Sequence, residues 1–333
     1  MTTIREVAKL AGVSPITVSR VINNAGYIRE ETRQKVEVAV SQLGYVPNTL
    51  SQSLRWKQTG MLALVLTDVT NPFWTTVARG VEDAASEAGY NVILCNTDES
   101  PQKQEQYLKA LLQKRVDGVL LVPARDDLED IKRVQTLKVP LVVLDRRLSQ
   151  PLADSVRCDS EQGAYRLTRL LLEHGHRQIA LLTGSPHVAT ATDRLDGYRC
   201  ALREFGLAKC AEMVFYGTFT LESGQEMTHR AMAMNPRPTA IFAGNNFIAI
   251  GMMQALHEAG IHVPEEMSAV GFDDLPASLL IDPFLTVAAQ PAYEMGVQAL
   301  KMLINRLASD GTAAPREVIL PVEIVERRSV LAR

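Results

Sequence analysis

The 333-residue sequence predicts an α/β protein, with a small all-α head followed by two doubly wound lobes that each contain a parallel sheet. Three observations support this fold. In the first 60 residues, hydrophobic positions recur at helical spacing and are separated by turns that contain glycine. From Gly60 onward, short apolar runs alternate with amphipathic segments, as in parallel sheets covered by helices on both faces. This alternation runs through two successive series, which favours two lobes.

The beginning of the chain predicts two short helices joined by a tight turn. Thr3 and Glu6 have the spacing of a capping box, and Gly12 suits the left-handed position that ends a helix. Ser14 is placed to cap a second helix, and Pro15 lies in its first turn, where a missing N–H costs little. This arrangement is a helix-turn-helix, the motif whose second helix enters the DNA major groove.

A third helix is expected over residues 30–43, which completes a head over residues 1–46. This pattern alone does not separate a DNA-binding head from any other small three-helix bundle. The second helix favours DNA, because its exposed face carries small hydroxyl groups and a basic group that suit phosphates and base edges. The charge distribution also favours DNA binding. Residues 1–58 hold eight Lys or Arg against four Glu, whereas the remainder holds 27 basic and 34 acidic residues. A basic head can therefore face phosphates while an acidic body stays away from the duplex.

The body is expected to begin at Gly60. The strands expected from apolar runs are 61–66, 91–95, 119–122, 141–144, 179–182, 213–215, 240–242 and 268–272. The helices expected between them are 72–89, 101–115, 194–205, 222–234 and 247–259. In open parallel sheets, ligands bind outside the carboxyl ends of the strands, so two facing lobes place a ligand site in the cleft between them.

Several functional classes are disfavoured. No run of 18 apolar residues predicts a membrane span, and the polar start lacks the pattern of a signal peptide, so we expect a cytoplasmic protein. The four cysteines are scattered without a CxxC pair, and we expect no metal and no cofactor. An enzyme would show a nucleotide-binding or catalytic motif, and none is found. A transport-type binding protein would need a signal peptide and no DNA-binding head.

Three motifs in the head resemble the LacI/GalR family of bacterial regulators. They are AGVS at 11–14, TVSRVIN at 17–23 and LGYVPN at 43–48. The resemblance implies that Pro15, Ile16 and Arg20 face the operator bases. Since the Pro15 and Ile16 side chains cannot form hydrogen bonds, Arg20 would be the main polar base reader. The residues that the resemblance places on phosphates are Thr3, Ser14, Thr17, Asn23 and Tyr45. The chain departs from the family at Arg29, a poor cap for the third helix.

Residues 47–59 are expected to form a hinge helix or linker. A helix this short is marginal alone, since isolated helices below about 12–15 residues are unstable in water, so a flexible linker is the alternative in the free protein. The resemblance implies that this segment folds on DNA, pairs with its twin and inserts Leu54 into the minor groove. Two heads and two hinges imply a homodimer on a palindromic operator.

The body motifs match the same family in order, and so the body resembles periplasmic sugar-binding proteins. They are NPF at 71–73, RVDG at 115–118, HGHRQI at 174–179, RLDGY at 194–198, PTA at 238–240, VGFDD at 270–274 and ERRS at 326–329. In that fold the last strands cross back between lobes. We therefore assign residues 60–160 and 291–321 to the N-terminal lobe, and residues 161–290 and 322–333 to the C-terminal lobe.

Residues near the strand ends are the candidates for an effector pocket, because amide, carboxylate and guanidinium groups beside aromatic rings suit a polyhydroxylated ligand. They are Phe73, Trp74, Arg146, Asp159, Arg194, Phe219, Asn245 and Asp273. Alternatively, Asp273 and Asp145 cap turns and Arg194 forms a surface ion pair. Asn246, where the family usually has Asp, and the pair Arg146 and Arg147 hint at a sugar acid. The expected function is a ligand-responsive transcription regulator, with repression of carbohydrate catabolism genes favoured over activation.

Overall fold

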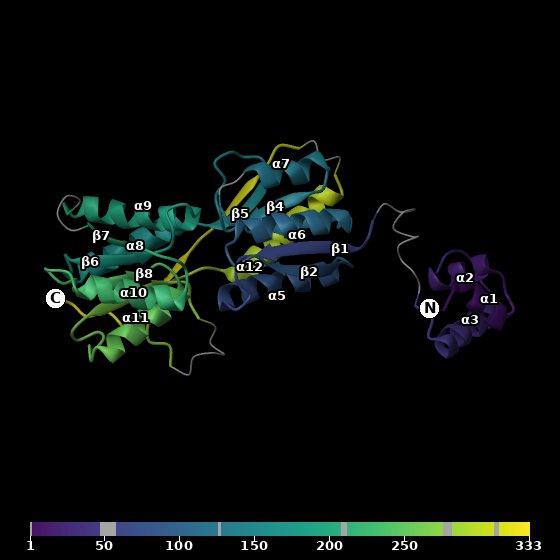
Figure 1. Ribbon diagram of the computed structural model, residues 1–333, viewed down its shortest axis with the longest axis horizontal. Helices are drawn as coiled ribbons and strands as arrows, with labels where there is room; N and C mark the ends of the chain where they lie inside the picture. The colour runs from purple at the N-terminus through teal and green to yellow at the C-terminus, as the bar shows by residue number, and fades with distance from the viewer. Residues whose placement is uncertain (1, 47–57, 126–127, 208–211, 276–281, 310–312) are drawn as a thin grey trace. The chain divides into compact units, whose positions relative to one another are not determined.

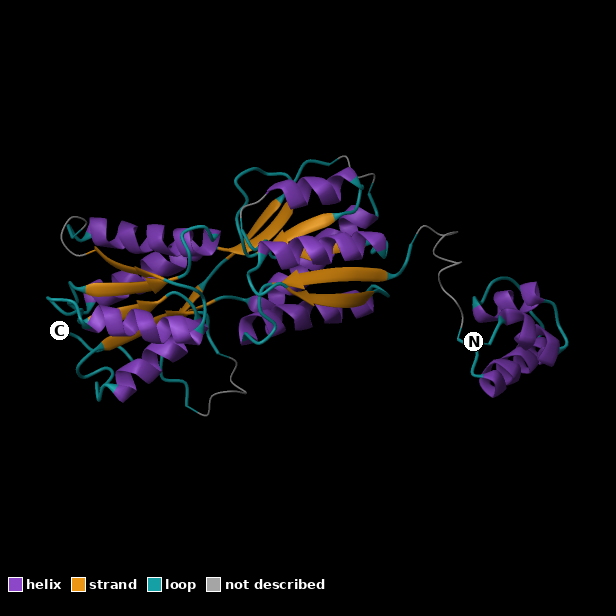
Figure 2. Cartoon of the chain, in the orientation of Figure 1, coloured by secondary structure: helices purple, strands orange, loops and turns teal. Residues whose placement is uncertain are grey.

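The computed structural model describes residues 2–46, 58–125, 128–207, 212–275, 282–309 and 313–333. The chain divides into two compact units, a head over Met1–Thr59 and a body over Gly60–Arg333. Figures 1 and 2 show an all-helical head and a body in which strands and helices alternate. No helix in the described part of the chain is long and apolar enough to cross a membrane.

Residues 2–46 of the head contain three helices, α1 (Ile4–Ala11), α2 (Pro15–Ile22) and α3 (Glu30–Leu43). Their small core is formed by apolar residues from all three helices, among them Val7, Val18 and Val36, which are fully buried. The expected caps are confirmed. The Thr3 backbone N–H donates to the Glu6 carboxylate at 2.7 Å, and Gly12 has a φ of 66°. No side chain caps α3, as expected from Arg29 at that position.

The described part of the body forms two six-stranded sheets, and every pairing in them is parallel except the one between β10 and β12. The first sheet has the order β11-β5-β4-β3-β1-β2, with β1 (Met61–Leu66), β2 (Asn91–Asn96), β3 (Gly118–Leu121), β4 (Leu141–Leu144), β5 (Asp154–Cys158) and β11 (Glu317–Leu320). The second has the order β12-β10-β9-β8-β6-β7, with β6 (Ile179–Thr183), β7 (Glu212–Tyr216), β8 (Ala240–Ala243), β9 (Ser268–Phe272), β10 (Thr286–Ala289) and β12 (Glu323–Val325). Central strands such as β3 and β6 are buried along their whole length, as expected of parallel strands covered on both faces.

Helices cover both sheets (Figure 2). The first lobe carries α5 (Pro72–Glu87), α6 (Pro101–Gln113), α7 (Leu128–Thr136) and α12 (Ala292–Leu307). The second carries α8 (Ser160–Glu173), α9 (Ala189–Glu204), α10 (Leu221–Met232) and α11 (Asn246–Glu258). The chain passes between lobes from β5 to α8, from β10 to α12 and from β11 to β12. These crossings bring β11 into the first sheet and β12 into the second.

The helix α9 corrects one expected boundary. It begins at Ala189 and not at residue 194, so Arg194 lies in the second turn of the helix. The expected helix 194–205 left out the preceding stretch, whose threonines have low helix propensity. In the structure Thr190 and Ala191 are buried, and packing overrides that weak preference.

Glycines let the helices α5 and α12 touch through their backbones. A Cβ atom on Gly80 of α5 would lie 2.2 Å from the carbonyl oxygen of Tyr293 in α12. A Cβ atom on Gly296 of α12 would lie equally close, 2.2 Å, to the carbonyl oxygen of Val77 in α5. No real side chain fits at these positions, so the crossing depends on glycine in both helices.

We therefore expect Gly80→Ala to lower the free energy of unfolding by about 1–3 kcal/mol or more, because the helices must move apart. Chemical denaturation of the full chain measures this change. Ser86→Ala, on the exposed side of the same helix, is the control and should leave stability almost unchanged. An unaltered denaturation midpoint for Gly80→Ala would contradict the close helix crossing.

Candidate effector pocket and DNA-binding surface

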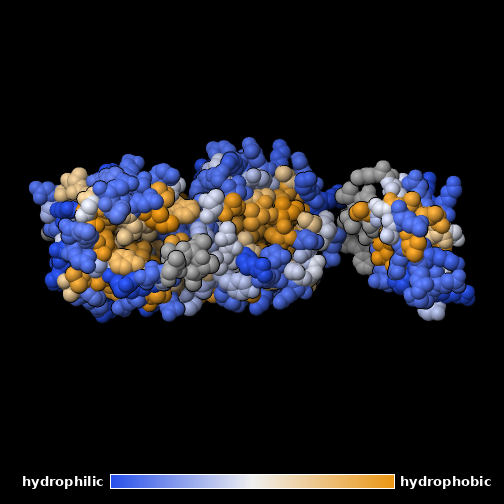
Figure 3. Space-filling model, turned by 90° about the horizontal axis from the view of Figure 1, so that it is seen from below, coloured by the Kyte–Doolittle hydropathy of each residue, from blue (hydrophilic) through white to orange (hydrophobic). Residues whose placement is uncertain are grey.

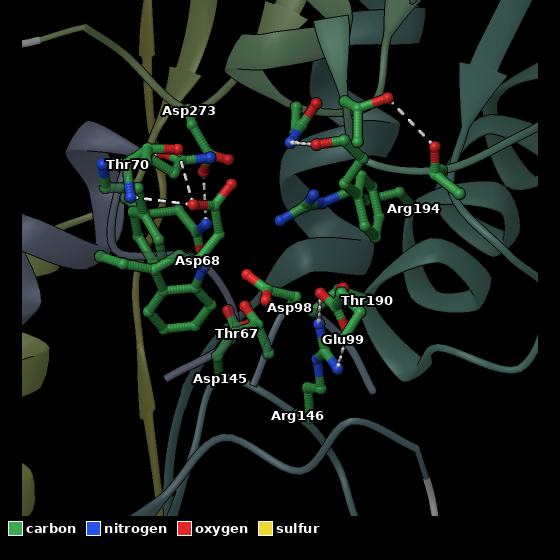
Figure 4. Close-up of a pocket in the computed structure, with 18 residues that line it drawn as sticks. Thr67, Asp68, Thr70, Asp98, Glu99, Asp145, Arg146, Thr190, Arg194 and Asp273 are labelled. Carbon is green, nitrogen blue, oxygen red and sulfur yellow. Dashed lines mark hydrogen bonds and ion pairs between the residues drawn. The ribbon is translucent and has the colours of Figure 1, made fainter. Parts of the chain in front are cut away.

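A cavity of about 410 Å³ lies between the two lobes of the body, at the carboxyl ends of their strands. Residues of both lobes surround it (Figure 4). They are Thr67, Asp68, Thr70, Asn71, Phe73, Trp74, Asp98, Glu99, Asp145, Arg146, Thr190, Arg194, Thr218, Phe219, Thr220, Asn245, Asp273 and Gln290. A cavity of this size accommodates a small molecule.

The structure brings seven of the eight expected effector residues to this cavity. They are Phe73, Trp74, Arg146, Arg194, Phe219, Asn245 and Asp273. Asp159 does not line it. Its carboxylate instead caps α8 by accepting a hydrogen bond from the Gln162 backbone N–H at 3.0 Å. Asp159 follows β5 and directly precedes α8, so the same position suits a pocket residue and a helix cap. In the structure the carboxylate serves as the cap.

Several lining residues were not predicted from the sequence. Asp68 follows β1, while Asp98 and Glu99 follow β2, so the strand-end rule that selected Arg146 would have selected these three as well. Gln290 follows β10, a strand that was not predicted from the sequence, so the strand-end rule could not select this residue. Its Nε2 atom donates to Asp273 at 2.5 Å.

Arg194 is a buried side chain of the pocket wall. It is only 3% exposed, and its guanidinium carbon lies 3.9 Å from the ring centroid of Phe272 and 5.9 Å from that of Phe219. Its Nη1 atom donates to the carbonyl of Gly244 at 2.6 Å. Stacking between aromatic rings and a bond to a fixed carbonyl hold the planar group in one orientation. The alternative of a surface ion pair is therefore wrong.

The other two arginines near the cleft already have partners. The Nη1 atom of Arg146 donates to Glu99 at 2.7 Å and to the Pro123 carbonyl at 2.5 Å, and its Nη2 atom also donates to Glu99 (Figure 4). Arg147 donates to Asp193 of the opposite lobe at 2.8 Å. Carboxylates of the protein therefore offset both guanidinium charges.

Two buried carboxyl groups lie in the cleft, and both have backbone conformations that are rare for residues other than glycine. Asp145 has a φ of 62° and Asp273 a φ of 66°. Burial raises the pKa of Asp145 to about 6, although Arg194 and Arg146 oppose this rise. Burial also raises the pKa of Asp273, against the influence of Arg194 and Gln290. The Asp145 Oδ1 atom has no hydrogen-bond partner among the described residues, so this carboxyl could accept a ligand hydroxyl after a small adjustment.

An aromatic pair forms another part of the pocket wall. Phe73 and Trp74 lie in the first turn of α5 in an edge-to-face arrangement, with ring centroids 4.7 Å apart. Asn71 caps this helix by accepting the Phe73 backbone N–H at 2.9 Å, and Pro72 at the first helical position needs no such partner. The cap fixes the direction in which both rings enter the cleft. Such rings offer an apolar surface to the face of a sugar ring.

The helix α2 presents the expected DNA-binding face in the head. Pro15, Ile16 and Arg20 are all exposed, and Ile16 is 69% exposed although it is hydrophobic. Ser14 caps α2 by accepting the Thr17 backbone N–H at 3.2 Å. Among the other expected phosphate contacts, Thr3 and Asn23 are exposed and Thr17 is half-buried, while the half-buried Tyr45 packs against the head core. Leu54 lies outside the described residues.

Comparisons with known proteins agree with this architecture. Residues 3–48 match the model described as bacterial regulatory proteins, lacI family, and residues 59–328 match that of periplasmic binding proteins and sugar binding domain of LacI family. The chain is 36% identical to the transcriptional repressor PurR of Photobacterium profundum and 37% identical to the ribose operon repressor of Halalkalibacterium halodurans, covering 99% and 97% of those proteins and 99% of itself in each case. The lac repressor dimer bound to operator and the anti-inducer ONPF matches over 99% of both chains, with 30% identity and a TM-score of 0.86.

Proposed function

Since the chain belongs to the LacI family of bacterial regulatory proteins, we propose that it binds operator DNA as a homodimer and responds to a neutral sugar. This family consists of transcription regulators, so the chain is a regulator and not an enzyme. The proposal assigns the interlobe cavity to the effector and the exposed face of α2 to DNA. Repression is the favoured outcome, because the relatives named above are repressors.

The excess of negatively charged groups in the pocket is the observation that favours a neutral effector. Five carboxyl groups and two guanidinium groups line the cavity, and no lysine or histidine is found among its described lining residues. Arg146 is engaged by Glu99, while Arg194 lies near two buried carboxyl groups. This excess of negative charge would repel an anionic ligand, and the repulsion is only weakly reduced in a site of low polarisability. A neutral polyol instead offers hydroxyl donors to the carboxylates, and so we favour a sugar over a sugar acid.

A thermal-shift experiment with matched pairs of ligands tests this choice. We expect D-ribose or D-glucose to raise the melting temperature of the full chain, whereas the corresponding aldonates should not. A ligand at 100 times its Kd stabilises the folded state by about 2.7 kcal/mol, enough for a clear shift. Stabilisation by an aldonate alone would contradict the charge argument. If neither class stabilised the chain, the proposed sugar effector would be wrong.

A hydrophobic face of the first lobe supports the proposed homodimer. Figure 3 shows hydrophobic side chains gathered on the side of this lobe on which Figure 1 places α5 and β2. The strand β2 is an edge strand, and its Leu94 is 47% exposed. Large exposed apolar patches are typical of interfaces, and a two-fold dimer would present the same patch from both copies. Sedimentation equilibrium of the full chain at micromolar concentration should give twice the chain mass.

The proposed base-reading role of Arg20 gives the test for DNA binding. A specific site is first selected from random DNA with the full chain, and affinities are then measured at one salt concentration. Arg20→Ala should weaken this complex by about 1–3 kcal/mol, since one bidentate base contact is lost. Arg33→Ala removes an equal charge from α3, where Arg33 donates to Asn24, and should weaken specific binding less. Equal losses for both variants would assign Arg20 a general electrostatic role only. Leu54, the proposed minor-groove wedge, can be tested on the same site.

A further inference from the structure

A pair of buried asparagines joins the two lobes at the cleft. Asn71 of the first lobe donates through Nδ2 to the Oδ1 atom of Asn246 at 2.9 Å, and Asn246 of the second lobe donates in return to Asn71 Oδ1 at 2.8 Å. The two residues are 5% and 2% exposed. Each amide is therefore both donor and acceptor in a closed ring of two hydrogen bonds.

The pair also connects the two helices that carry parts of the pocket wall. Asn71 caps α5, whose first turn holds Phe73 and Trp74. Asn246 is the first residue of α11, directly after Asn245, which both caps that helix and lines the cavity. A relative movement of the lobes that breaks the amide pair would shift these two helix ends with respect to each other. The pair therefore couples the relative position of the two lobes to the shape of the pocket wall.

We propose that Asn71 and Asn246 form an interlobe latch that favours the closed cleft and positions the aromatic wall for the effector. The two are positioning residues, and the consequence of the latch for effector response rests on the proposed function. Two neutral hydrogen bonds in a buried site favour the closed arrangement roughly five- to hundredfold. The other interlobe contact described above, between Arg147 and Asp193, contributes less, because the Arg147 side chain is 50% exposed and its charge is screened by water.

Asn246→Asp tests the latch with almost no change in size. The substitution replaces the amide group that donates to Asn71 Oδ1 with a carboxylate oxygen, so two acceptors face each other. A carboxylate in the first turn suits the positive end of α11, so the helix itself is not weakened. Hydrogen–deuterium exchange of the ligand-free full chain should then show the first turn of α5, in the opposite lobe, exchanging at least about fivefold faster.

Gln254→Glu is the matched control. It makes the same amide-to-carboxylate change in the same helix, but Gln254 accepts its hydrogen bond from Gln225 within the second lobe. We expect no change in the exchange of α5. A second variant, Asn71→Ser, keeps a helix-capping hydroxyl for Phe73 but is too short to reach Asn246. It should speed exchange at the start of α11, and it provides the test if Asn246→Asp fails to fold.

The latch is overturned if neither substitution speeds exchange in the opposite lobe, or if Gln254→Glu speeds the exchange of α5 as much as Asn246→Asp does. The measurement uses neither DNA nor an effector. Failure of the proposed operator or sugar binding would therefore leave this result intact, and failure of the latch would leave the proposed function intact.

Discussion

Replacing Arg194 with alanine should lower the affinity for the effector about ten- to hundredfold while operator binding persists. The guanidinium offsets the charge of two buried carboxyl groups, Asp145 and Asp273, and donates to the Gly244 carbonyl. Its removal leaves the Gly244 carbonyl unpaired and the carboxyl groups without their nearby cation, and the effector loses a charged donor, which is worth about 1.5–3 kcal/mol. Calorimetric titration with the sugar identified by thermal shift measures the affinity.

The same substitution should change how stability depends on pH. The pKa of Asp145 is about 6 in the folded protein, above its ordinary value of 3.8. A group with a raised folded pKa contributes stability that is fully present below the unfolded pKa and lost as the pH rises through the folded pKa. Because Arg194 lowers the pKa of Asp145, Arg194→Ala raises it further and extends this loss to higher pH. The stability deficit of the variant should therefore be larger at pH 7 than at pH 5.

Two variants show whether the effect depends on the geometry of the guanidinium. Arg194→Lys keeps the positive charge but not the flat surface that stacks on Phe272, so an intermediate affinity is expected. Arg199→Ala removes an arginine from the same helix that pairs with Glu212 at the surface, and effector affinity should not change. A normal effector response in Arg194→Ala would remove this residue from the proposed site.

The pocket could be located from the sequence because its position follows from a general property of parallel sheets. Ligand-facing residues follow strands, and apolar runs such as 141–144 mark the strands clearly, so Arg146 and Asp273 could be placed. Asp159 obeyed the same rule yet caps a helix, since spacing alone does not separate these two roles. Arg194 was also expected near the strand ends, at the start of a helix, and the structure instead places it in the second turn of α9.

Other features depend on contacts between distant segments and could not be predicted. The pairing of Arg147 with Asp193 joins residues 46 positions apart, and this pairing weakened the expectation of a sugar acid. The hydrogen-bonded pair of Asn71 and Asn246 joins residues 175 positions apart. A sequence pattern reports local periodicity and capping, whereas these contacts arise only when two lobes have folded and met.

His176 should contribute more to stability than any other histidine that the structure describes. In the structure it is 1% exposed, and its Nδ1 atom lies 2.9 Å from Thr239 Oγ1, while its Nε2 atom lies 3.0 Å from Ser268 Oγ and 3.1 Å from the Leu331 carbonyl. A carbonyl only accepts, so Nε2 carries the proton and Nδ1 accepts from Thr239. The ring thereby ties the C-terminal segment to the second sheet.

We expect His176→Ala to lower the free energy of unfolding by about 2–4 kcal/mol, because it leaves a cavity and unpaired polar groups. Burial, with smaller contributions from nearby cations, lowers the pKa of His176 below its ordinary 6.5. A lowered folded pKa gives stability that is present above 6.5 and lost as the pH falls through the folded value. The difference in stability between wild type and variant should therefore shrink as the pH falls below 6.5.

Urea denaturation at a series of pH values measures this difference. Taking wild type minus variant matters, because Asp145 titrates in an overlapping range with the opposite sign, and its contribution cancels in the subtraction. His262→Ala, at an exposed position of the same lobe, should show neither the loss nor its pH dependence. A loss for His176→Ala that stayed constant from pH 7.5 to pH 5 would mean that the ring acts by packing alone. An unchanged stability would mean that the C-terminal segment is held in place without it.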